Sequence, residues 1–277
     1  MSRLPTLILR ILSLLPLRVL HALGSVLGWI TYGTSPTYRR HLRAHLAQAG
    51  FTDARLRRAA IASAGKMIAE VPALWFRRHE EVVALMRETH GFHEAIAQRS
   101  RGKAVLFLTP HMGSFEAAAQ YASAHAPMTF LYRPPKMRWL DPLMRRGRSR
   151  GGAQLAPTDL KGVRQLFLAL RRGEAVAFLP DQVPGRGEGE WAEFFGRPAY
   201  TMTLAMRLAE RDNVACYLAY ARRLPRGRGY ALEVRPMPAA QPGETPTRRL
   251  NRGIEALIRE CPEQYLWGYN RYKGAPA

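Results

Sequence analysis

The chain has 277 residues, and its 42 lysines and arginines against 21 aspartates and glutamates give a net charge of +21. Hydrophobic residues make up 47% of it, which is enough for a substantial core and excludes a disordered protein. Two cysteines, Cys216 and Cys261, do not make a disulfide framework, and a reducing, cytoplasm-facing compartment fits them best. So basic a surface attracts polyanions such as nucleic acid, anionic lipid, phosphorylated substrates or acidic proteins.

The most apolar stretch covers residues 3–33. Arg10 and Arg18 interrupt it, so it lacks the eighteen or so uncharged apolar residues that indicate a membrane span. At about 100° per residue these arginines and His21 share one helix face, while leucine and isoleucine fill most of the rest. This pattern predicts a helix that lies in a membrane interface with its arginines toward the headgroups. The alternative is a helix docked on the protein's own core.

Beyond residue 33, short apolar runs alternate with helical stretches. Nearly all-apolar strands between helices predict an α/β fold, with a central, mostly parallel sheet covered by helices. No repeat, low-complexity tract or linker interrupts the pattern, so we expect an anchor at 1–33 and one catalytic domain at 34–277. In chain order, helices are expected at 54–76, at 80–100 with an interruption near 91, and at 114–125, 138–150, 159–172, 201–211 and from 246 on. Strands are expected at 104–109, 128–132, 175–179, 214–220 and 230–235.

A histidine and a carboxylate follow the first strand, in "PHMGSFE" (110–116). His111 lies in the turn at the strand's carboxyl end, where open α/β sheets place their sites. Gly113 or Ser114 opens the next helix and puts Glu116 in its first turn, where the helix dipole favours a charged carboxylate. If His111 folds back over the helix start, Glu116 can accept the proton on one ring nitrogen and leave the other free as a base. A histidine that only caps the helix is the alternative.

Four blocks of the chain have a distinctive order and spacing. They are "PHMGSFE" (110–116), "LYRPPKMRWLDPLMRRGRSRGG" (131–152), "FLPDQVPGRGEGEWAEFFGRPAYTMT" (178–203) and "PEQYLWGYNRYK" (262–273). The first resembles the H-x4-D/E motif of the glycerolipid and lysophospholipid acyltransferases. All four together resemble the branch of that superfamily that adds secondary acyl chains in lipid A biosynthesis. The resemblance runs from about 105 to 273 and is loose over 34–100.

The resemblance implies a catalytic pair and donors for the reaction. His111, supported by Glu116, would deprotonate an acceptor hydroxyl that attacks the thioester carbonyl of a bound acyl donor. The backbone N–H groups at Gly113 and Ser114, at a helix start, would stabilise the resulting oxyanion.

The resemblance also implies a set of substrate-binding residues. Arg133, at a strand end, would bind phosphate through its planar guanidinium; a surface ion pair is the alternative. Asp181 and Gln182 follow another strand end and would position the acceptor or brace the site, unless Asp181 only forms a turn. An acyl pocket would be lined by Phe194, Phe195 and Gly196, for which ordinary core is the alternative.

These features predict an acyltransferase at the cytoplasmic face of a bacterial inner membrane. It would move a fatty acyl chain from an acyl carrier protein to a hydroxyl of a phosphorylated glycolipid, with a lipid A precursor as the leading acceptor. The broad arginine surface favours an acidic carrier protein over coenzyme A as the donor. One alternative is an acyltransferase for a lysophospholipid or an amino-acid-containing lipid. Another is a non-catalytic basic protein that binds anionic lipid or nucleic acid, although binding alone needs no base.

No metal, cofactor or nucleic acid is expected. His41 and His45 have a spacing seen in metal ligands on helices, but no carboxylate or thiol lies near them in the sequence. The basic segment 145–152 has no aromatic stacking pattern and belongs to no recognisable nucleic-acid-binding module.

Overall fold

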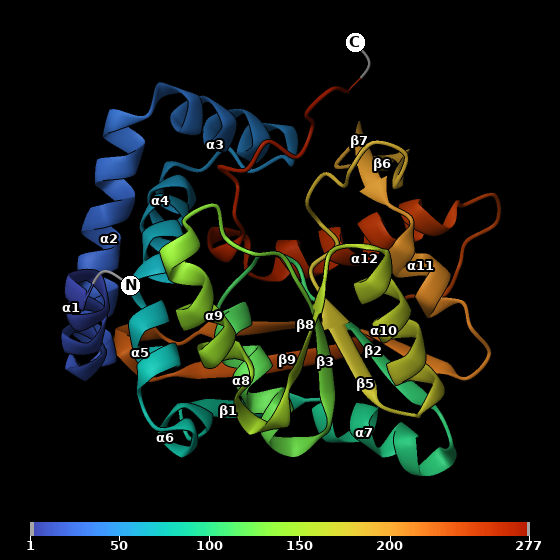
Figure 1. The fold of residues 1–277 in the computed structure, drawn as a ribbon. Helices are drawn as coiled ribbons and strands as arrows, with labels where there is room; N and C mark the ends of the chain where they lie inside the picture. Colours follow the sequence, from blue (N-terminus) through green and yellow to red (C-terminus); the bar gives the residue numbers. More distant parts are fainter. Residues whose placement is uncertain (1–2, 276–277) are drawn as a thin grey trace.

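A seven-stranded sheet crosses the centre of the computed structural model, which describes residues 3–275 (Figure 1). The strand order is β1–β9–β8–β2–β5–β3–β4. Every neighbouring pair is parallel except β8 and β9, which form an antiparallel hairpin. The predicted α/β fold with a mostly parallel sheet is thus confirmed. The strands are β1 (Met86–His90), β2 (Ala104–Leu108), β3 (Met128–Tyr132), β4 (Gln154–Pro157), β5 (Ala175–Phe178), β8 (Val214–Arg223) and β9 (Tyr230–Pro236).

Helices cover both faces of the sheet because its central strands are apolar on both sides. Strands β2 and β5 are buried along their whole length. Val105 and Phe107 of β2 point to the face on which α8 packs, whereas Leu106 and Leu108 point to the face covered by α10 and α12. The covering helices are α7 (Phe92–Ala97), α8 (Phe115–His125), α9 (Asp141–Arg148), α10 (Leu160–Arg171), α11 (Leu204–Ala209) and α12 (Pro246–Glu260).

The carboxyl ends of three neighbouring parallel strands meet at one edge of the sheet. β2 pairs with β5, and β5 pairs with β3 on its other side. The loops that leave these strands therefore start side by side, and they carry His111 after β2, Asp181 after β5 and Arg133 after β3. This is the arrangement that the sequence predicted for a site at the carboxyl edge.

Among the N-terminal helices, α2 packs on α4 through small residues. Pro16 separates α1 from α2, and α2 then lies against α4. A Cβ atom added to Gly65 of α4 would lie only 1.9 Å from the carbonyl oxygen of Gly24 and 2.9 Å from Cα of Gly28, so only glycine fits this contact. The helices are α1 (Arg3–Leu14), α2 (Leu17–Thr34), α3 (Pro36–Gln48), α4 (Ala54–Ala69), α5 (Val71–Phe76) and α6 (His79–Val83).

The outward faces of α1 and α2 are apolar. Within residues 3–275, no helix combines the length and the apolarity needed to cross a bilayer. Residues 1–2 of the predicted anchor and 276–277 of the predicted catalytic domain lie outside the described part of the chain. The exposed apolar side chains are Leu4, Leu7, Ile8, Ile11 and Leu14 on α1, and Leu23, Val26, Leu27, Trp29 and Ile30 on α2.

Some segments form strands that the sequence did not predict. Residues 86–90, expected to be helical, form the edge strand β1 because they pair in parallel with β9. Residues 189–202 form a separate antiparallel hairpin of β6 (Gly189–Phe194) and β7 (Arg197–Met202), so the helix expected at 201–211 is reduced to α11. The hairpin turns through Phe195 and Gly196, whose φ angles of +48° and +74° are both left-handed. Strand pairing, with the distant β9 in the first case and within the local β6–β7 hairpin in the second, has overridden the helical pattern.

Candidate active site

His111 is held by Asp181 through two hydrogen bonds. Its backbone N–H donates to Oδ2 of Asp181 over 2.9 Å, and its ring Nδ1 lies 2.7 Å from Oδ1. The Asp181 side chain is 2% exposed, whereas that of His111 is 20% exposed. An ionised carboxylate at this position keeps the proton on Nδ1, so the other ring nitrogen, Nε2, is left as the basic atom.

Asp181 is charged in this environment. Burial alone would raise the pKa of its carboxyl group, but the charge and hydrogen bonds of His111 and the charge of Arg271 hold the pKa below its usual value. Arg271 is itself buried and donates to the carbonyl oxygen of Tyr200 and to Oγ1 of Thr201. The carboxylate that orients His111 is therefore fixed by the C-terminal segment.

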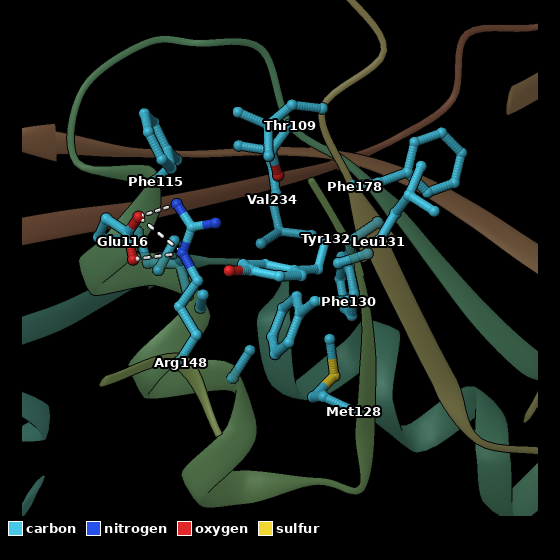
Figure 2. Close-up of a pocket in the computed structure, with 18 of the residues that line it drawn as sticks. Thr109, Phe115, Glu116, Met128, Phe130, Leu131, Tyr132, Arg148, Phe178 and Val234 are labelled. Atoms are coloured by element: carbon cyan, nitrogen blue, oxygen red, sulfur yellow. Dashed lines mark hydrogen bonds and ion pairs between the residues drawn. The ribbon is translucent and has the colours of Figure 1, made fainter. Parts of the chain in front are cut away.

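Glu116 does not contact His111, which corrects the expected hydrogen bond between them. It lies in the first turn of α8, as predicted, but its carboxylate faces α9 (Figure 2). Nε of Arg148 donates to Oε1 over 2.9 Å, and the indole Nε1 of Trp75 donates to Oε2 over 3.1 Å. Burial would lower the pKa of Arg148, but Glu116 holds it above its ordinary value. Arg148 thus neutralises the Glu116 carboxylate beside the start of α8.

The amides of Gly113 and Ser114 are already used, which corrects their expected role as oxyanion donors. The Gly113 N–H donates to the carbonyl of Gln264 over 3.0 Å, and the Ser114 N–H donates to the carbonyl of Ala221 over 2.7 Å. Gly113 has a φ of +58°, and a Cβ there would lie 2.0 Å from the oxygen of Ala221. Glycine is needed because the loop passes so close to β8.

The next amides along the chain are free. Phe115 and Glu116 open α8, and within the described residues their N–H groups have no hydrogen-bond acceptor. A helix start of this kind presents unpaired N–H groups and a partial positive charge. The Phe115 ring lies next to the imidazole of His111, with 5.4 Å between the ring centroids. The residue that carries the first free donor therefore also contacts the imidazole through its side chain.

Arg133 and Gln182 lie on the same rim. The Arg133 side chain is exposed at the end of β3, and no ion pair involves it among residues 3–275. Burial raises the pKa of the Tyr269 hydroxyl, and the charge of Arg133 opposes that rise. The Tyr269 hydroxyl oxygen accepts a 2.9 Å hydrogen bond from the N–H of Val183, two residues after Asp181. Gln182 lies between Asp181 and Val183 in the sequence, and its side chain is half-buried. The three expected binding positions Arg133, Asp181 and Gln182 are thus brought to one edge, with Asp181 as the brace.

An apolar cavity lies under this edge, between α8 and the sheet (Figure 2). Thr109 and Phe115 line it near His111, and the small side chains of Ala118, Ala119 and Ala122 leave space along α8. The remaining lining residues come mostly from β2, β3, β5 and β9, and they include Phe107, Met128, Phe130, Leu131, Phe178, Leu232 and Val234.

Phe194, Phe195 and Gly196 do not line this cavity. Phe194 and Phe195 are buried with the aromatic residues of the C-terminal segment, and the Phe195 and Trp267 ring centroids are 6.0 Å apart. Gly196 is exposed in the β6–β7 turn. The three residues form the end of β6 and the turn of the β6–β7 hairpin, which the sequence alone does not distinguish from an apolar pocket.

Two residues at the site were missed by the sequence reasoning. Arg148 lies within the basic helix of the second sequence block, so its chemistry was visible but its pairing with Glu116 was not. Trp75 lies in α5, some forty residues before Glu116, in a stretch that gave no signal of function. Glu116 is therefore held by two other helices, α5 before it in the sequence and α9 after it.

A histidine oriented by a buried carboxylate lies beside an apolar cavity at the carboxyl edge of a mostly parallel sheet. This arrangement is typical of α/β enzymes that transfer acyl groups in lipid metabolism. Comparison with known families places the chain more narrowly. The model of the bacterial lipid A biosynthesis acyltransferases matches residues 4–274, and the chain belongs to that family. The protein is therefore an acyltransferase.

Curated relatives agree with this assignment. The chain is 28% identical over 219 residues to a lipid A biosynthesis lauroyltransferase of Escherichia coli (strain K12), covering 77% of this chain and 70% of the relative. It is 28% identical over 218 residues, with the same coverage, to a lipid A biosynthesis palmitoleoyltransferase of that organism. It is also 25% identical over 219 residues to a lipid A biosynthesis acyltransferase of Haemophilus influenzae, covering 77% of this chain and 69% of the relative.

Proposed function

We propose that the protein transfers a fatty acyl chain from an acyl carrier protein thioester to a hydroxyl of a phosphorylated glycolipid, a lipid A precursor. The observation that carries the proposal is the His111–Asp181 pair beside an apolar cavity. Membership of the lipid A family supports the reaction class, and the names of the relatives support a fatty acyl chain as the transferred group.

The reaction uses His111 as the base. Nε2 takes the proton from the acceptor hydroxyl as its oxygen attacks the thioester carbonyl, and Asp181 stabilises the imidazolium that forms. The carbonyl oxygen becomes an oxyanion, and the free N–H groups at the start of α8 are the donors for it. When the tetrahedral intermediate collapses, the carbon–sulfur bond breaks and the imidazolium returns its proton to the leaving thiolate. A positioned base of this kind contributes roughly 10²–10⁴-fold to the rate.

Glu116 has a different part from the one that its motif implies. Its ion pair with Arg148 fixes the first turn of α8 to α9 and cancels a negative charge beside the oxyanion. An unpaired carboxylate there would oppose the developing charge. Glu116 is thus a positioning residue that acts through Arg148 and the helix start.

The apolar cavity is the site for the acyl chain. Phe115 and Ala122 are seven residues apart on α8, so the lined stretch of the helix is about 10 Å long at about 1.5 Å per residue. Each methylene buried in such a cavity contributes roughly 0.8 kcal/mol. Arg133, exposed on the rim and free of ion pairs within the described chain, is placed to bind a phosphate of the acceptor.

The carrier protein docks on the arginines of the segment 138–148. Arg138 and Arg146 are exposed, and within residues 3–275 neither has an ion-pair partner. Arg145 instead pairs with Asp141 over 3.2 Å and lies over the ring of Tyr132. Acyl carrier proteins are acidic along the helix that partners recognise, so these free arginines support a protein donor over coenzyme A.

The apolar outward faces of α1 and α2 rest on the cytoplasmic side of the bacterial inner membrane. Ile8 and Ile11 of α1 are 48% and 55% exposed, and burying them in an interface is favourable. Ile8→Gln/Ile11→Gln should reduce sedimentation with phospholipid vesicles. Leu160→Gln/Leu168→Gln, on the exposed side of α10, is the matched control and should sediment like the parent. Equal loss in both variants contradicts the proposed membrane face.

The function itself is tested in the cell that carries the protein. Lipid A from cells with and without the protein is compared by mass spectrometry, and cells that carry only His111→Ala serve as the control for catalysis. We expect one acyl chain to be missing without the protein and with His111→Ala. Unchanged lipid A together with accumulation of a lysophospholipid, or of an amino-acid-containing lipid that lacks one acyl chain, identifies one of the alternative acceptors instead.

A further inference from the structure

A second cavity lies between α2, α4 and the loop that joins β8 to β9, and its volume is about 460 Å³. It is far more polar than the acyl cavity. Five cationic side chains but only one carboxylate, that of Glu263, line it. The cations are Arg18, Lys66, Arg222, Arg223 and Arg226. We call this cavity the basic cleft.

Most of the positive charge in the basic cleft is uncompensated. Arg223 is buried and pairs with Glu70 over 2.8 Å. For the other four cations, no ion pair occurs within residues 3–275. Burial and the charge of Arg223 lower the pKa of Lys66. Glu263 accepts a hydrogen bond from the thiol of Cys261. Like charges held together in a partly closed space attract an anion.

The basic cleft opens beside the apolar surface of the same helix. Arg18, His21 and Ser25 follow one another at the three- and four-residue spacing of a single face of α2, and all three line the cleft. The apolar side chains of Leu23 and Val26, on other faces of α2, are exposed. An anion in the cleft would therefore lie next to the apolar surface that is proposed to face the bilayer.

The loop from β8 to β9 is held in place to complete the cleft. Arg226 has a φ of +58°, a left-handed conformation that arginine seldom adopts. A Cβ on the following Gly227 would lie 2.4 Å from the backbone nitrogen of Arg18, so the loop packs directly on the start of α2. A strained backbone that persists at a binding wall is a reason to look for a ligand there.

We propose that the basic cleft binds the phosphate of a membrane phospholipid headgroup. This site is separate from Arg133, which lies at the carboxyl edge of β3. The guanidinium of Arg223 also donates to the carbonyl oxygen of Gly113, two residues after His111, so the bound lipid is linked to the loop that carries the base. The inference does not depend on acyl transfer, and its test measures binding alone.

The experiment compares two double variants that remove the same charge. Arg18→Gln/Arg226→Asn removes two of the five cations that line the cleft, and asparagine accepts the left-handed conformation better than arginine does. The control, Arg10→Gln/Arg228→Gln, removes one positive charge from α1 and one from the same loop. Both positions are exposed, and neither lines the cleft. Circular dichroism and thermal unfolding establish that both variants are folded. Vesicles of phosphatidylcholine alone, or of phosphatidylcholine with phosphatidylglycerol, are the probes, and inorganic phosphate is titrated separately.

We expect the cleft variant to lose on the order of tenfold of its preference for phosphatidylglycerol vesicles, because both cations that it loses line the cavity proposed to hold the headgroup phosphate. The control variant should lose markedly less. Equal loss in both variants means that diffuse surface charge is responsible and overturns the proposal. Unchanged vesicle binding with lost binding of inorganic phosphate assigns the cleft to a soluble phosphate compound and overturns the lipid assignment.

Discussion

Replacing Asp181 by asparagine tests whether His111 depends on Asp181, its partner in the structure, or on Glu116, the partner that the sequence motif suggests. The amide keeps the size of the side chain and still accepts the His111 backbone N–H through its oxygen. Its NH₂ group, however, can donate to Nδ1, which moves the ring proton to Nε2 and removes the base. The loss is therefore that of the base itself, and we expect kcat to fall by about 10³-fold, or about 4 kcal/mol at 1.36 kcal/mol per decade.

Fold and substrate binding should change little in this variant. Arg271 loses the nearby charge of Asp181 but keeps its acceptors on Tyr200 and Thr201. Asp181 does not line the acyl cavity, so KM for the acyl donor should stay close to that of the parent. Activity is followed as acyl transfer from a radiolabelled thioester, and folding as the thermal unfolding midpoint.

Glu116→Gln is the decisive comparison. It leaves Arg148 without its ion pair but does not touch His111, so its kcat should fall less than that of Asp181→Asn. If the order is reversed, or if folded Asp181→Asn turns over within about fivefold of the parent, Asp181 does not orient the base and the reasoning fails.

Three further predictions concern the chain length, the donor and the pH. Ala122→Phe should fill the inner part of the acyl cavity and shift the preference toward shorter acyl donors, whereas Ala124→Phe, exposed on the same helix, should not; an unchanged chain-length profile refutes the cavity assignment. Arg138→Glu/Arg146→Glu should lower kcat/KM for acyl carrier protein thioesters more than for the matching coenzyme A thioesters, and most at low salt; equal effects count against the carrier protein. Burial raises the pKa of Glu70, but Arg223 and His21 lower it, and the net pKa lies below the ordinary 4.5. The contribution of Glu70 to folding stability is therefore complete well above pH 4.5 and is lost as the pH falls through the lower folded pKa. In Glu70→Gln, chemical denaturation should show lower stability at pH 7 and a shallower loss in acid, and a parallel shift at all pH values contradicts this.

The sequence predicted the sheet because its strands are strongly apolar and regularly alternate with helices. It also placed His111, Asp181 and Arg133 at strand ends, and parallel pairing then requires that they share an edge. It did not identify the carboxylate that meets His111, because Glu116 is five residues away and Asp181 is seventy. That choice depends on the adjacency of β2 and β5, which no local pattern encodes.

The oxyanion donors were misplaced for a similar reason. The amides of Gly113 and Ser114 are local to the motif, but their acceptors, on Gln264 and Ala221, come from segments more than a hundred residues away. A backbone hydrogen bond to a distant segment leaves no trace in the sequence around the donor. The same limit explains the burial of Phe194, which packs on the C-terminal segment.

If α1 and α2 lie on the membrane as proposed, the glycine contact between α2 and α4 has a consequence for the position of the base relative to the bilayer. Where Gly24 and Gly28 of α2 meet Gly65 of α4, no side chain separates the two backbones, so the height of His111 above the lipid plane would be set when the chain folds. In the proposed reaction, the acceptor would then reach the base by lateral diffusion, while the thioester donor would arrive from solution. Turnover should follow the acceptor's mole fraction in the bilayer, so adding inert lipid at a constant bulk amount of acceptor would slow the enzyme by surface dilution.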